Sequence, residues 1–414
     1  MLVLTQKEEP GTNWVRSRVD RTTDALTRAF EHGLTGHVFV KRNGKTVVLA
    51  DGTEAVEFTS CSYLGLETHS EIIAAAERTL RRTGVHFASA RTRMRPAELD
   101  ELESILGEIY RGNSVTCFTS VSNVHLSVLP LLGSGTLPSY PVSGAGVTFF
   151  VERTAHASIQ VLRGILQQIG EVDRFSVDEI EVFVDRLERA RSAGRTPIIL
   201  VDGVGSMGGL IDIKVLLDLA EVHGGYLYVD DAHGISITGP QGGGYAFEEF
   251  GRTLPRQVIL AGSLSKAFGC AGGFGALADE ADSRVVRRFG NPLIFGGPIA
   301  LPMVGACLAS ARLHVRGGLA GLQDRLWRNV SRFDARTGGA LVNAGLRSPI
   351  RGALFATEEE ALETAARLRR AGILVTPAFY PTVARGTGLI RFALSALHTE
   401  EHIDAAARDL RPTA

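Results

Sequence analysis

The sequence predicts an α/β protein with a mostly parallel, doubly wound sheet and a smaller α+β domain toward its C-terminus. From about Ser114 to Ala278, short apolar runs such as PIILVDGV and YLYVDDAHG alternate with helical stretches such as IKVLLDLAEVHG. That alternation is typical of parallel strands joined by helices. After Pro298, a long helical pattern precedes strand-like runs (GALFAT, GILVTP, LIRFAL) and helical segments at 358–371 and 399–411. The last block therefore indicates a second, smaller unit.

The residues ahead of the main sheet predict a helical arm and a small antiparallel sheet. Asp20 or Thr22 is a suitable cap for a helix that continues through Phe30. The following stretch alternates β-branched and polar residues around Asn43-Gly44 and Asp51-Gly52. Such dipeptides favour tight turns between short antiparallel strands.

Three further segments complete the expected organisation. The run CAGGFGALAD follows the strand VILAG too closely for a crossover helix, so it should return antiparallel. Residues 132–146 predict a long loop. The glycine-rich segment 239–245 matches neither a dinucleotide-binding nor a Walker motif, so we expect a flexible loop without nucleotide binding. The expected regions are an arm with small strands (1–60), a large domain (61–300) and a small domain (301–414).

Composition favours a cytoplasmic protein that acts on a small molecule. Across 414 residues, 44 Lys plus Arg face 45 Asp plus Glu, and the net charge of −1 gives no general attraction to nucleic acid or an anionic membrane. No segment reads as a signal sequence or a membrane span. The four cysteines have no zinc-ligand spacing and indicate neither a metal site nor a disulfide framework (Cys61, Cys117, Cys270, Cys307).

Lys266 is the first candidate for chemistry. It follows the apolar strand VILAG within Gly262-Ser263-Leu264-Ser265-Lys266, and ligands of open α/β sheets bind at the C-terminal ends of strands. A partly desolvated lysine amine can act as a nucleophile or a proton carrier, which arginine cannot. A solvated loop lysine is the alternative.

A second candidate is the strand YLYVDDAHG, which ends on two acids and a histidine. A carboxylate at Asp230 can keep the pyridine nitrogen of pyridoxal 5′-phosphate (PLP) protonated, and His233 can hydrogen-bond the ring oxygen. Taken alone, the pattern is also compatible with a metal site or an ordinary strand-end acid. Together with Lys266, it favours PLP.

Three more positions have both a functional and a structural interpretation. His156 lies at the start of a helix and is either a cofactor contact or a cap. The turn Ser120-Val121-Ser122 enters a helix whose amides could receive a phosphate, although serine there is often a cap. Arg391 lies in an apolar strand, where a charge needs a partner. That partner is either the carboxylate of an amino-acid substrate or an acidic side chain in a structural ion pair.

These motifs, with SYLGLETH, AHAS, DGVGSMGGLID, VDDAHG, GPQGGGYAFEEFG, SLSKAFGCAGG and LIRFALSALHTEEHI in the same order, resemble the α-oxoamine synthase family of PLP enzymes over about residues 21–410. The resemblance implies fold type I and a homodimer with active sites at the subunit interface. It also implies a reaction in which an amino acid displaces the lysine, loses its α-proton to it and attacks an acyl thioester of coenzyme A or a carrier protein. Loss of CO₂ then gives an α-amino ketone.

The same resemblance implies a role for each candidate residue. Lys266 carries the cofactor as a Schiff base, Asp230 pairs with the pyridine nitrogen, and His156 stacks on the ring. His233 and Ser206 reach the ring oxygen. The implied phosphate contacts come from the strand-end turns (Ser120, Val121, Ser122, Ser263, Ser265). Arg391 grips the amino-acid carboxylate.

Departures from the family pattern cluster around the phosphate and the substrate. Val121 stands in place of a glycine, Cys61 in place of an asparagine near the substrate carboxylate, and Gly296-Gly297 in place of a Ser/Thr pair that reaches the partner's phosphate. They predict retained PLP chemistry with an altered substrate pair. A PLP reaction without a thioester (transamination, decarboxylation or attack on another electrophile) and a non-catalytic partner-binding subunit remain as alternatives.

Overall fold

The computed structural model describes residues 14–380 and 382–410, and its contacts divide them into two units. One unit runs from Leu64 to Gln323. The other combines the described residues up to Tyr63 with those from Asp324 onward. The domain limits expected at residues 60 and 300 stay a prediction.

The Leu64–Gln323 unit is built on a seven-stranded sheet with the order β4-β10-β9-β8-β7-β5-β6. Only β10 runs antiparallel to its neighbours, β4 and β9, as the short connection after β9 predicted. All other pairs are parallel. The strands are β4 (Ser114–Phe118), β5 (Val147–Glu152), β6 (Glu171–Phe175), β7 (Thr196–Asp202), β8 (Tyr226–Asp230), β9 (Val258–Ser263) and β10 (Gly273–Leu277).

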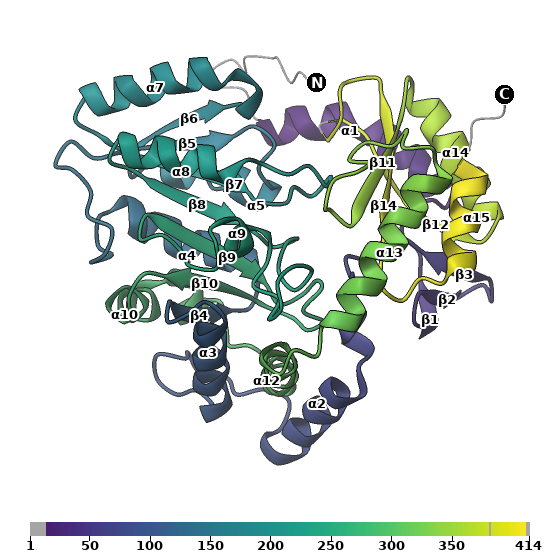
Figure 1. Ribbon diagram of the computed structural model, residues 1–414, viewed down its shortest axis with the longest axis horizontal. Helices are drawn as coiled ribbons and strands as arrows, with labels where there is room; N and C mark the ends of the chain where they lie inside the picture. Colours follow the sequence, from purple (N-terminus) through teal and green to yellow (C-terminus); the bar gives the residue numbers. More distant parts are fainter. Residues whose placement is uncertain (1–13, 381, 411–414) are drawn as a thin grey trace. The chain divides into compact units, whose positions relative to one another are not determined.

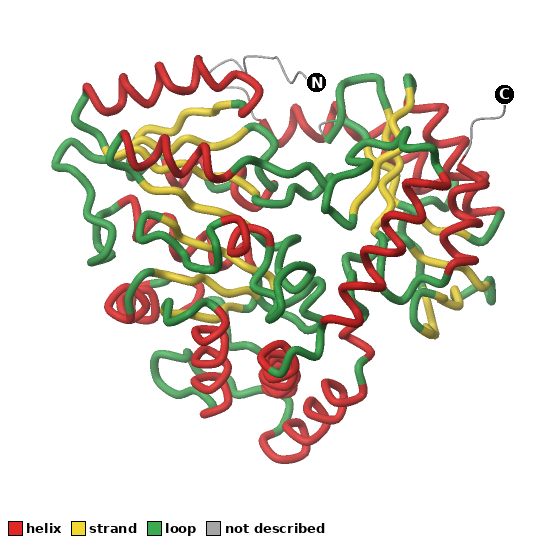
Figure 2. The backbone as a smooth tube through the Cα atoms, in the orientation of Figure 1, coloured by secondary structure: helices red, strands yellow, loops and turns green. Residues whose placement is uncertain are grey.

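Helices cover both faces of this sheet (Figures 1 and 2). The helices of the unit are α2 (Ser70–Thr83), α3 (Ala97–Ile109), α4 (Val121–Gly133), α5 (Ala157–Gln160), α6 (Arg163–Leu166), α7 (Ile180–Ser192), α8 (Ile213–Val222), α9 (Tyr245–Glu249), α10 (Glu280–Phe289), α11 (Asn291–Phe295) and α12 (Leu301–Val315), with short 3₁₀ turns at Leu66–Thr68 and Val177–Glu179. α13 (Ala320–Arg336) crosses the boundary between the units. The helices on both faces confirm the doubly wound α/β fold.

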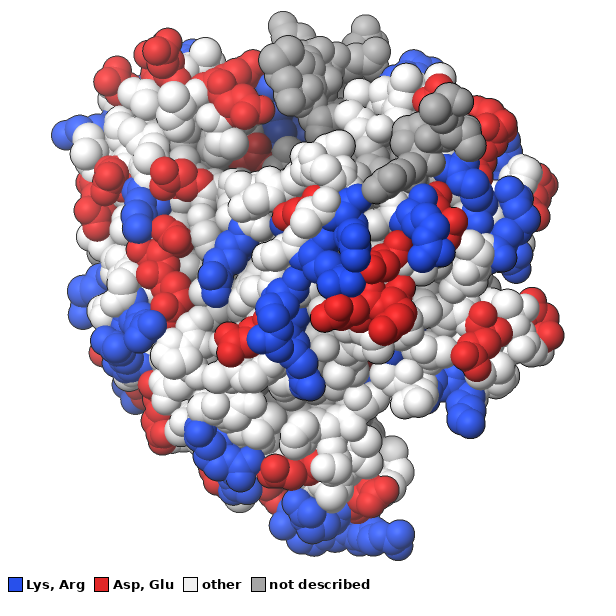
Figure 3. All heavy atoms as spheres, turned by 45° about the vertical axis from the view of Figure 1, so that its right-hand side comes forward, with Lys and Arg blue, Asp and Glu red and all other residues white. Residues whose placement is uncertain are grey.

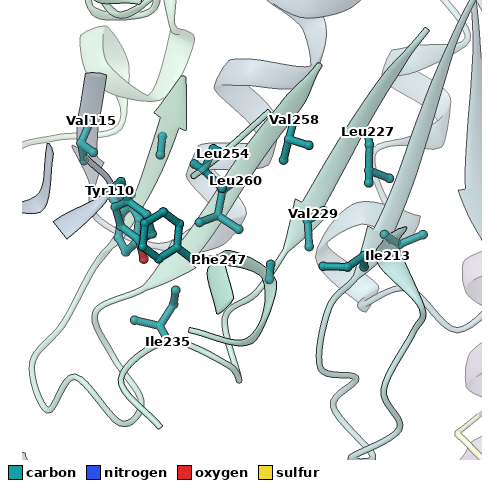
Figure 4. Packing of buried hydrophobic residues seen from close by; sticks show 14 of the residues in the cluster. Tyr110, Val115, Ile213, Leu227, Val229, Ile235, Phe247, Leu254, Val258 and Leu260 are labelled. Atoms are coloured by element: carbon teal, nitrogen blue, oxygen red, sulfur yellow. The ribbon is translucent and has the colours of Figure 1, made fainter. Parts of the chain in front are cut away.

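Two apolar cores lie against the sheet, one on each face. Alternate residues of a strand point to opposite faces. Leu227 and Val229 of β8 accordingly belong to the core that α3, α8 and α9 line, whereas Tyr228 belongs to the core that α4 lines. Figure 4 shows part of the first core, in which the rings of Tyr110 and Phe247 lie together next to Leu260 of β9. β5, β7 and β9 are buried along their whole length, which explains why their sequences are continuous apolar runs.

The second unit holds two small sheets, with the orders β1-β2-β3-β12 and β11-β14-β13. The turns at Gly44 and Gly52 confirm the predicted antiparallel hairpins, and β12 adds in parallel to β3. Its elements are α1 (Trp14–Glu31), β1 (Phe39–Asn43), β2 (Thr46–Leu49), β3 (Glu54–Glu57), β11 (Ile350–Phe355), α14 (Glu358–Arg370), β12 (Ile373–Leu374), β13 (Thr376–Ala378), β14 (Gly388–Ala393) and α15 (Glu400–Leu410).

Two sequence predictions were wrong in detail. The first helix begins at Trp14, ahead of the expected cap at Asp20, because the Asp20 side chain is exposed and is therefore compatible with a position inside the helix. The segment 239–245 is an anchored, partly buried turn: the Tyr110 hydroxyl donates to the Gly243 carbonyl (3.0 Å), and Gln323 donates to the Gly239 carbonyl (2.9 Å). Its partners are distant in sequence, so its composition alone suggested a flexible loop.

The surface mixes both signs of charge. On the face that Figure 3 shows, basic and acidic side chains are interspersed, in keeping with the balanced composition. Within residues 14–380 and 382–410, no helix combines the length and apolar character that crossing a bilayer requires.

Candidate active site

Polar side chains meet at one edge of the seven-stranded sheet, where the parallel strands end. Asp202 closes β7 directly beside Asp230, which closes β8. Asp230 in turn lies level with Ala261 of β9, two residues before Ser263 and the turn that carries Lys266. The strand-end position inferred from the sequence therefore brings Lys266 and Asp230 to the same edge of the sheet.

Asp230 is a buried carboxyl with several donors. Its Oδ1 accepts the N–H of Ala232 (3.0 Å), and its Oδ2 lies 3.0 Å from Nε2 of His125, a residue of α4. Burial alone raises the pKa of Asp230, but the hydrogen bond from His125 and the charge of Lys266 outweigh it, and the pKa lies below its usual value. The carboxyl is therefore ionised at neutral pH.

Lys266 is half-buried in a turn that serine side chains close. Ser263 Oγ accepts the N–H of Ser265 (3.0 Å), and Ser265 Oγ accepts the N–H of Gly272 (2.9 Å) and donates to its carbonyl (3.0 Å). Gly269 has φ +81°, and a Cβ there would lie 2.4 Å from Leu66 Cβ, so glycine is required. The predicted phosphate contacts Ser263 and Ser265 thus also shape the turn that presents the lysine.

His156 caps the short helix α5. Its Nδ1 lies 2.7 Å from Ser158 Oγ, and its backbone N–H donates to Asp202 Oδ1 (3.1 Å). Burial lowers the pKa of His156, and the charge of Lys266 lowers it further against the opposing effect of Asp230. The ring is therefore neutral at pH 7 and lies within electrostatic range of both strand-end residues. The structure thus shows His156 as a helix cap. Its role at the cofactor stays a prediction.

Asp231 and His233 follow Asp230 in the next turn, and both are buried. Asp231 Oδ2 accepts the N–H of Ala246 at the start of α9 (3.0 Å), while Oδ1 is a buried oxygen without a hydrogen-bond partner among the described residues. Burial raises the pKa of Asp231 well above its usual value. Asp231 therefore differs chemically from its neighbour Asp230 and anchors the turn that carries His233.

The turn Ser120-Val121-Ser122 opens α4 as predicted. Ser120 Oγ accepts the N–H of Asn123 (3.3 Å), Val121 is half-buried and Ser122 is exposed. A Cβ on Gly273 would lie 2.6 Å from the Val121 nitrogen, so β10 packs closely beneath this turn. α4 is long enough for its unpaired N-terminal amides to attract a phosphate.

Ser206 lies in the half-buried turn that joins β7 to α8. The N–H groups of Gly205 and Gly208 donate within the turn, to the carbonyls of Gly209 (2.8 Å) and Gly205 (2.7 Å) respectively. A bridge between Val204 and Leu210 closes it. The structure thus gives Ser206 a fixed position next to the C-terminal end of β7.

Arg391 and Cys61 belong to the other unit, where they contact each other. Arg391 Nη2 donates to Cys61 Sγ (3.1 Å), and its Nε is buried without a hydrogen-bond partner among the described residues. Burial lowers the pKa of Arg391, but Tyr63 and Cys61 more than offset it. Among the described residues, the groups that act on this guanidinium are Tyr63 and Cys61 and none is a carboxylate, so the structural ion pair considered above is not seen there.

Sequence reasoning missed His125, whose side chain is fully buried. The only local signal was one ionisable residue within the apolar helix sequence VHLSVLPLL. A histidine in such a helix needs a polar partner, but the sequence could not say that the partner is Asp230.

Known proteins with similar sequences share nearly the whole length of this chain. The family model for aminotransferase class I and II matches residues 53–410. An 8-amino-7-oxononanoate synthase of Stutzerimonas stutzeri is 32% identical over 86% of this chain and 87% of its own. A 2-amino-3-ketobutyrate coenzyme A ligase of Escherichia coli is 30% identical over 87% of both chains.

Solved structures show the same fold. A serine palmitoyltransferase from S. paucimobilis with bound PLP and myriocin superimposes with a TM-score of 0.82 at 22% identity, covering 95% of this chain and 96% of the other. An 8-amino-7-oxononanoate synthase from Francisella tularensis gives 0.68 at 21% identity, covering 86% and 96%.

The chain belongs to the aminotransferase class I and II family, and within it to the α-oxoamine synthases, which are PLP-dependent acyltransferases. The predictions of family, fold type I, cofactor and enzyme class are confirmed.

The residues at the strand-end edge fit PLP. A buried, ionised carboxyl suits a protonated pyridine nitrogen, and a lysine amine lies at the adjacent strand end. The N-terminus of α4 lies at the same edge, because Gly273 of β10 is level with both Phe118 and Ser263. The edge thus supplies suitable groups for the nitrogen, aldehyde and phosphate of the cofactor.

Proposed function

We propose that this protein condenses an amino acid with an acyl thioester of coenzyme A or a carrier protein, with loss of CO₂, to give an α-amino ketone. The observation that carries the proposal is that Lys266 follows one strand end while an ionised, buried Asp230 closes the adjacent strand, with the lysine charge acting on that carboxyl. The names of the two curated relatives support the thioester, since one is a coenzyme A ligase and both are synthetic enzymes.

PLP, when bound, withdraws electrons from the bonds at the α-carbon of the amino acid. Asp230 holds a proton at the pyridine nitrogen, which strengthens that withdrawal. The Lys266 amine takes the proton from the substrate α-carbon and later returns one. Its place at the strand end, partly removed from water, suits an amine that must be neutral for part of the reaction.

The remaining residues bind and orient. His156 stacks on the cofactor ring, and His233 with Ser206 reaches its oxygen. The phosphate is held by the N-terminus of α4 and the neighbouring turns (Ser120, Val121, Ser122, Ser263, Ser265). Arg391, with Cys61 beside it, binds the amino-acid carboxylate, and its buried, unsatisfied Nε supports a ligand there. We also propose a homodimer in the cytoplasm.

A coupled assay tests this function. The purified protein, loaded with PLP, is mixed with a panel of amino acids and with acyl-coenzyme A or acyl-carrier-protein donors. Free thiol is followed with a colorimetric reagent and the amino ketone by mass spectrometry. We expect thiol release that needs both substrates and is absent in Lys266→Ala. A keto acid or aldehyde formed without any thioester, and no thiol release, would refute the proposal.

A further inference from the structure

His125 connects a buried helix to the carboxyl group of the site. It lies in the second turn of α4, its side chain has no exposed surface, and both ring nitrogens have partners. Nε2 lies 3.0 Å from Asp230 Oδ2, and Nδ1 lies 2.8 Å from the Tyr228 hydroxyl.

The two partners of His125 come from one strand and fix its ring. Tyr228 and Asp230 are alternate residues of β8, so they face the same side of the sheet, which α4 covers. An ionised carboxylate only accepts hydrogen bonds, so Nε2 must carry the proton that points at Asp230. The Tyr228 hydroxyl contacts Nδ1 on the other side of the ring, so the two contacts together fix the orientation of the imidazole.

Three buried carboxyls at this edge provide an internal comparison. Burial raises the pKa of Asp202 and of Asp231 well above its usual value, whereas that of Asp230 is lowered. All three are nearly inaccessible to solvent. Asp230 differs in having the imidazole N–H as a donor, so a histidine partner accompanies the only carboxyl of the three whose pKa is lowered.

We propose that His125 is a positioning residue, which holds the Asp230 carboxylate charged and oriented toward the cofactor's pyridine nitrogen, and that Tyr228 in turn holds the His125 ring in place. The inference rests on the proposed function only in placing PLP beside Asp230. His125 itself touches neither cofactor nor substrate in this role.

The test measures the protonation state of the cofactor's pyridine nitrogen. Full-length protein is reconstituted with PLP that is ¹⁵N-labelled in the pyridine ring, and its NMR shift is recorded at neutral pH beside the dissociation constant for PLP. In the wild type we expect the shift of a protonated nitrogen. His125→Phe, which removes the donor, should move the shift toward the unprotonated value and weaken PLP binding about 10- to 100-fold, the range for a hydrogen bond to a charged group.

Two further variants keep the test sharp. His125→Gln retains an amide donor and should restore most of the protonated shift. Tyr228→Phe removes one hydroxyl and should give an intermediate shift with PLP binding weakened several-fold. If His125→Phe does not fold, Tyr228→Phe tests the proposal in its place. A wild-type shift and affinity in His125→Phe or in Tyr228→Phe would overturn the proposal.

His314→Phe is the matched control. His314 is equally buried, in α12, and bonds Ser236 Oγ (2.8 Å) and the Ser310 carbonyl (2.7 Å) instead of Asp230. We expect lower stability with an unchanged ¹⁵N shift, and a shift change equal to that of His125→Phe would also contradict the proposal. A wild type that binds PLP but releases no thiol refutes the proposed function alone, because the NMR comparison still applies.

Discussion

Asp230 and Asp231 are adjacent in the sequence, but their carboxyl groups are chemically distinct in the structure. Asp230 is ionised because donors surround it, whereas burial raises the pKa of Asp231. The charge of Lys266 lowers the pKa of both carboxyls, so the difference arises from His125, which bonds Asp230 from another element. The chemical role of each acid at this edge therefore depends on the residues that contact it from other elements.

Substituting each acid in turn separates the two roles. Asp230→Asn removes the charge that holds the pyridine proton, and we expect thiol release to fall by about 100-fold or more. Asp231→Asn replaces a group whose raised pKa already favours the neutral form, so activity should stay within a few-fold. Steady-state rates of thiol release measure both. Equal losses in the two variants would contradict the assignment.

Arg391 offers a second test at the scale of one residue. A guanidinium binds a carboxylate in a bidentate manner, which lysine cannot reproduce. Arg391→Lys should therefore raise KM for the amino acid by about 10-fold or more and leave KM for the acyl thioester nearly unchanged. The thioester serves as the internal control. A parallel rise in both constants would indicate general damage to the protein.

At the scale of elements, the turn between β8 and α9 shows how glycines and one acid build a support. Gly244 precedes α9 with φ +98°, and a Cβ there would lie 2.5 Å from Asp231 Oδ2. Asp231 occupies the place of a helix cap, because its oxygen accepts the Ala246 N–H. The buried turn thus fixes the segment that carries His233.

Gly244→Ala should destabilise the protein by about 2 kcal/mol or more, since it adds backbone strain and a clash. Gly144→Ala is the control, because a Cβ at Gly144 would meet nothing within 4 Å. Urea unfolding followed by circular dichroism measures both. Equal midpoints for the two variants would mean that the turn is not rigid.

The alternation of strands and helices was predictable because both sheet faces are buried, and the apolar pattern of each strand or helix follows from that burial. The antiparallel return of β10 followed from the length of its connection alone. Two contacts could not be predicted from the sequence: the anchoring of the 239–245 turn and the contact of His125 with Asp230. Each joins segments that are far apart in sequence. The family resemblance supplied the residue roles, and the structure added the hydrogen-bond partners that distinguish one acid from the next.

At the scale of the whole molecule, one buried histidine should make stability depend on pH. Burial lowers the pKa of His314 from 6.5 to about 4. Between these values the unfolded chain binds a proton that the folded protein does not, so the free energy of unfolding falls as pH decreases from 6.5 toward 4. The loss attributable to this residue is at most about 3 kcal/mol.

His314→Gln keeps a hydrogen-bonding side chain that does not titrate. Chemical denaturation at several pH values between 7 and 4 should therefore give a shallower acid decline for the variant than for the wild type. Identical slopes would show that His314 does not contribute to the decline.

The central claim is that Lys266 carries PLP, and borohydride reduction followed by peptide mapping tests it most directly. Reduction of the PLP-loaded protein fixes the cofactor to the amine that holds it as a Schiff base, and mass spectrometry of the digest locates the added mass. We expect a pyridoxyl group on the peptide that contains Lys266, with loss of the visible absorbance band. A label on another lysine, or no label on a protein that had shown the band, would contradict it.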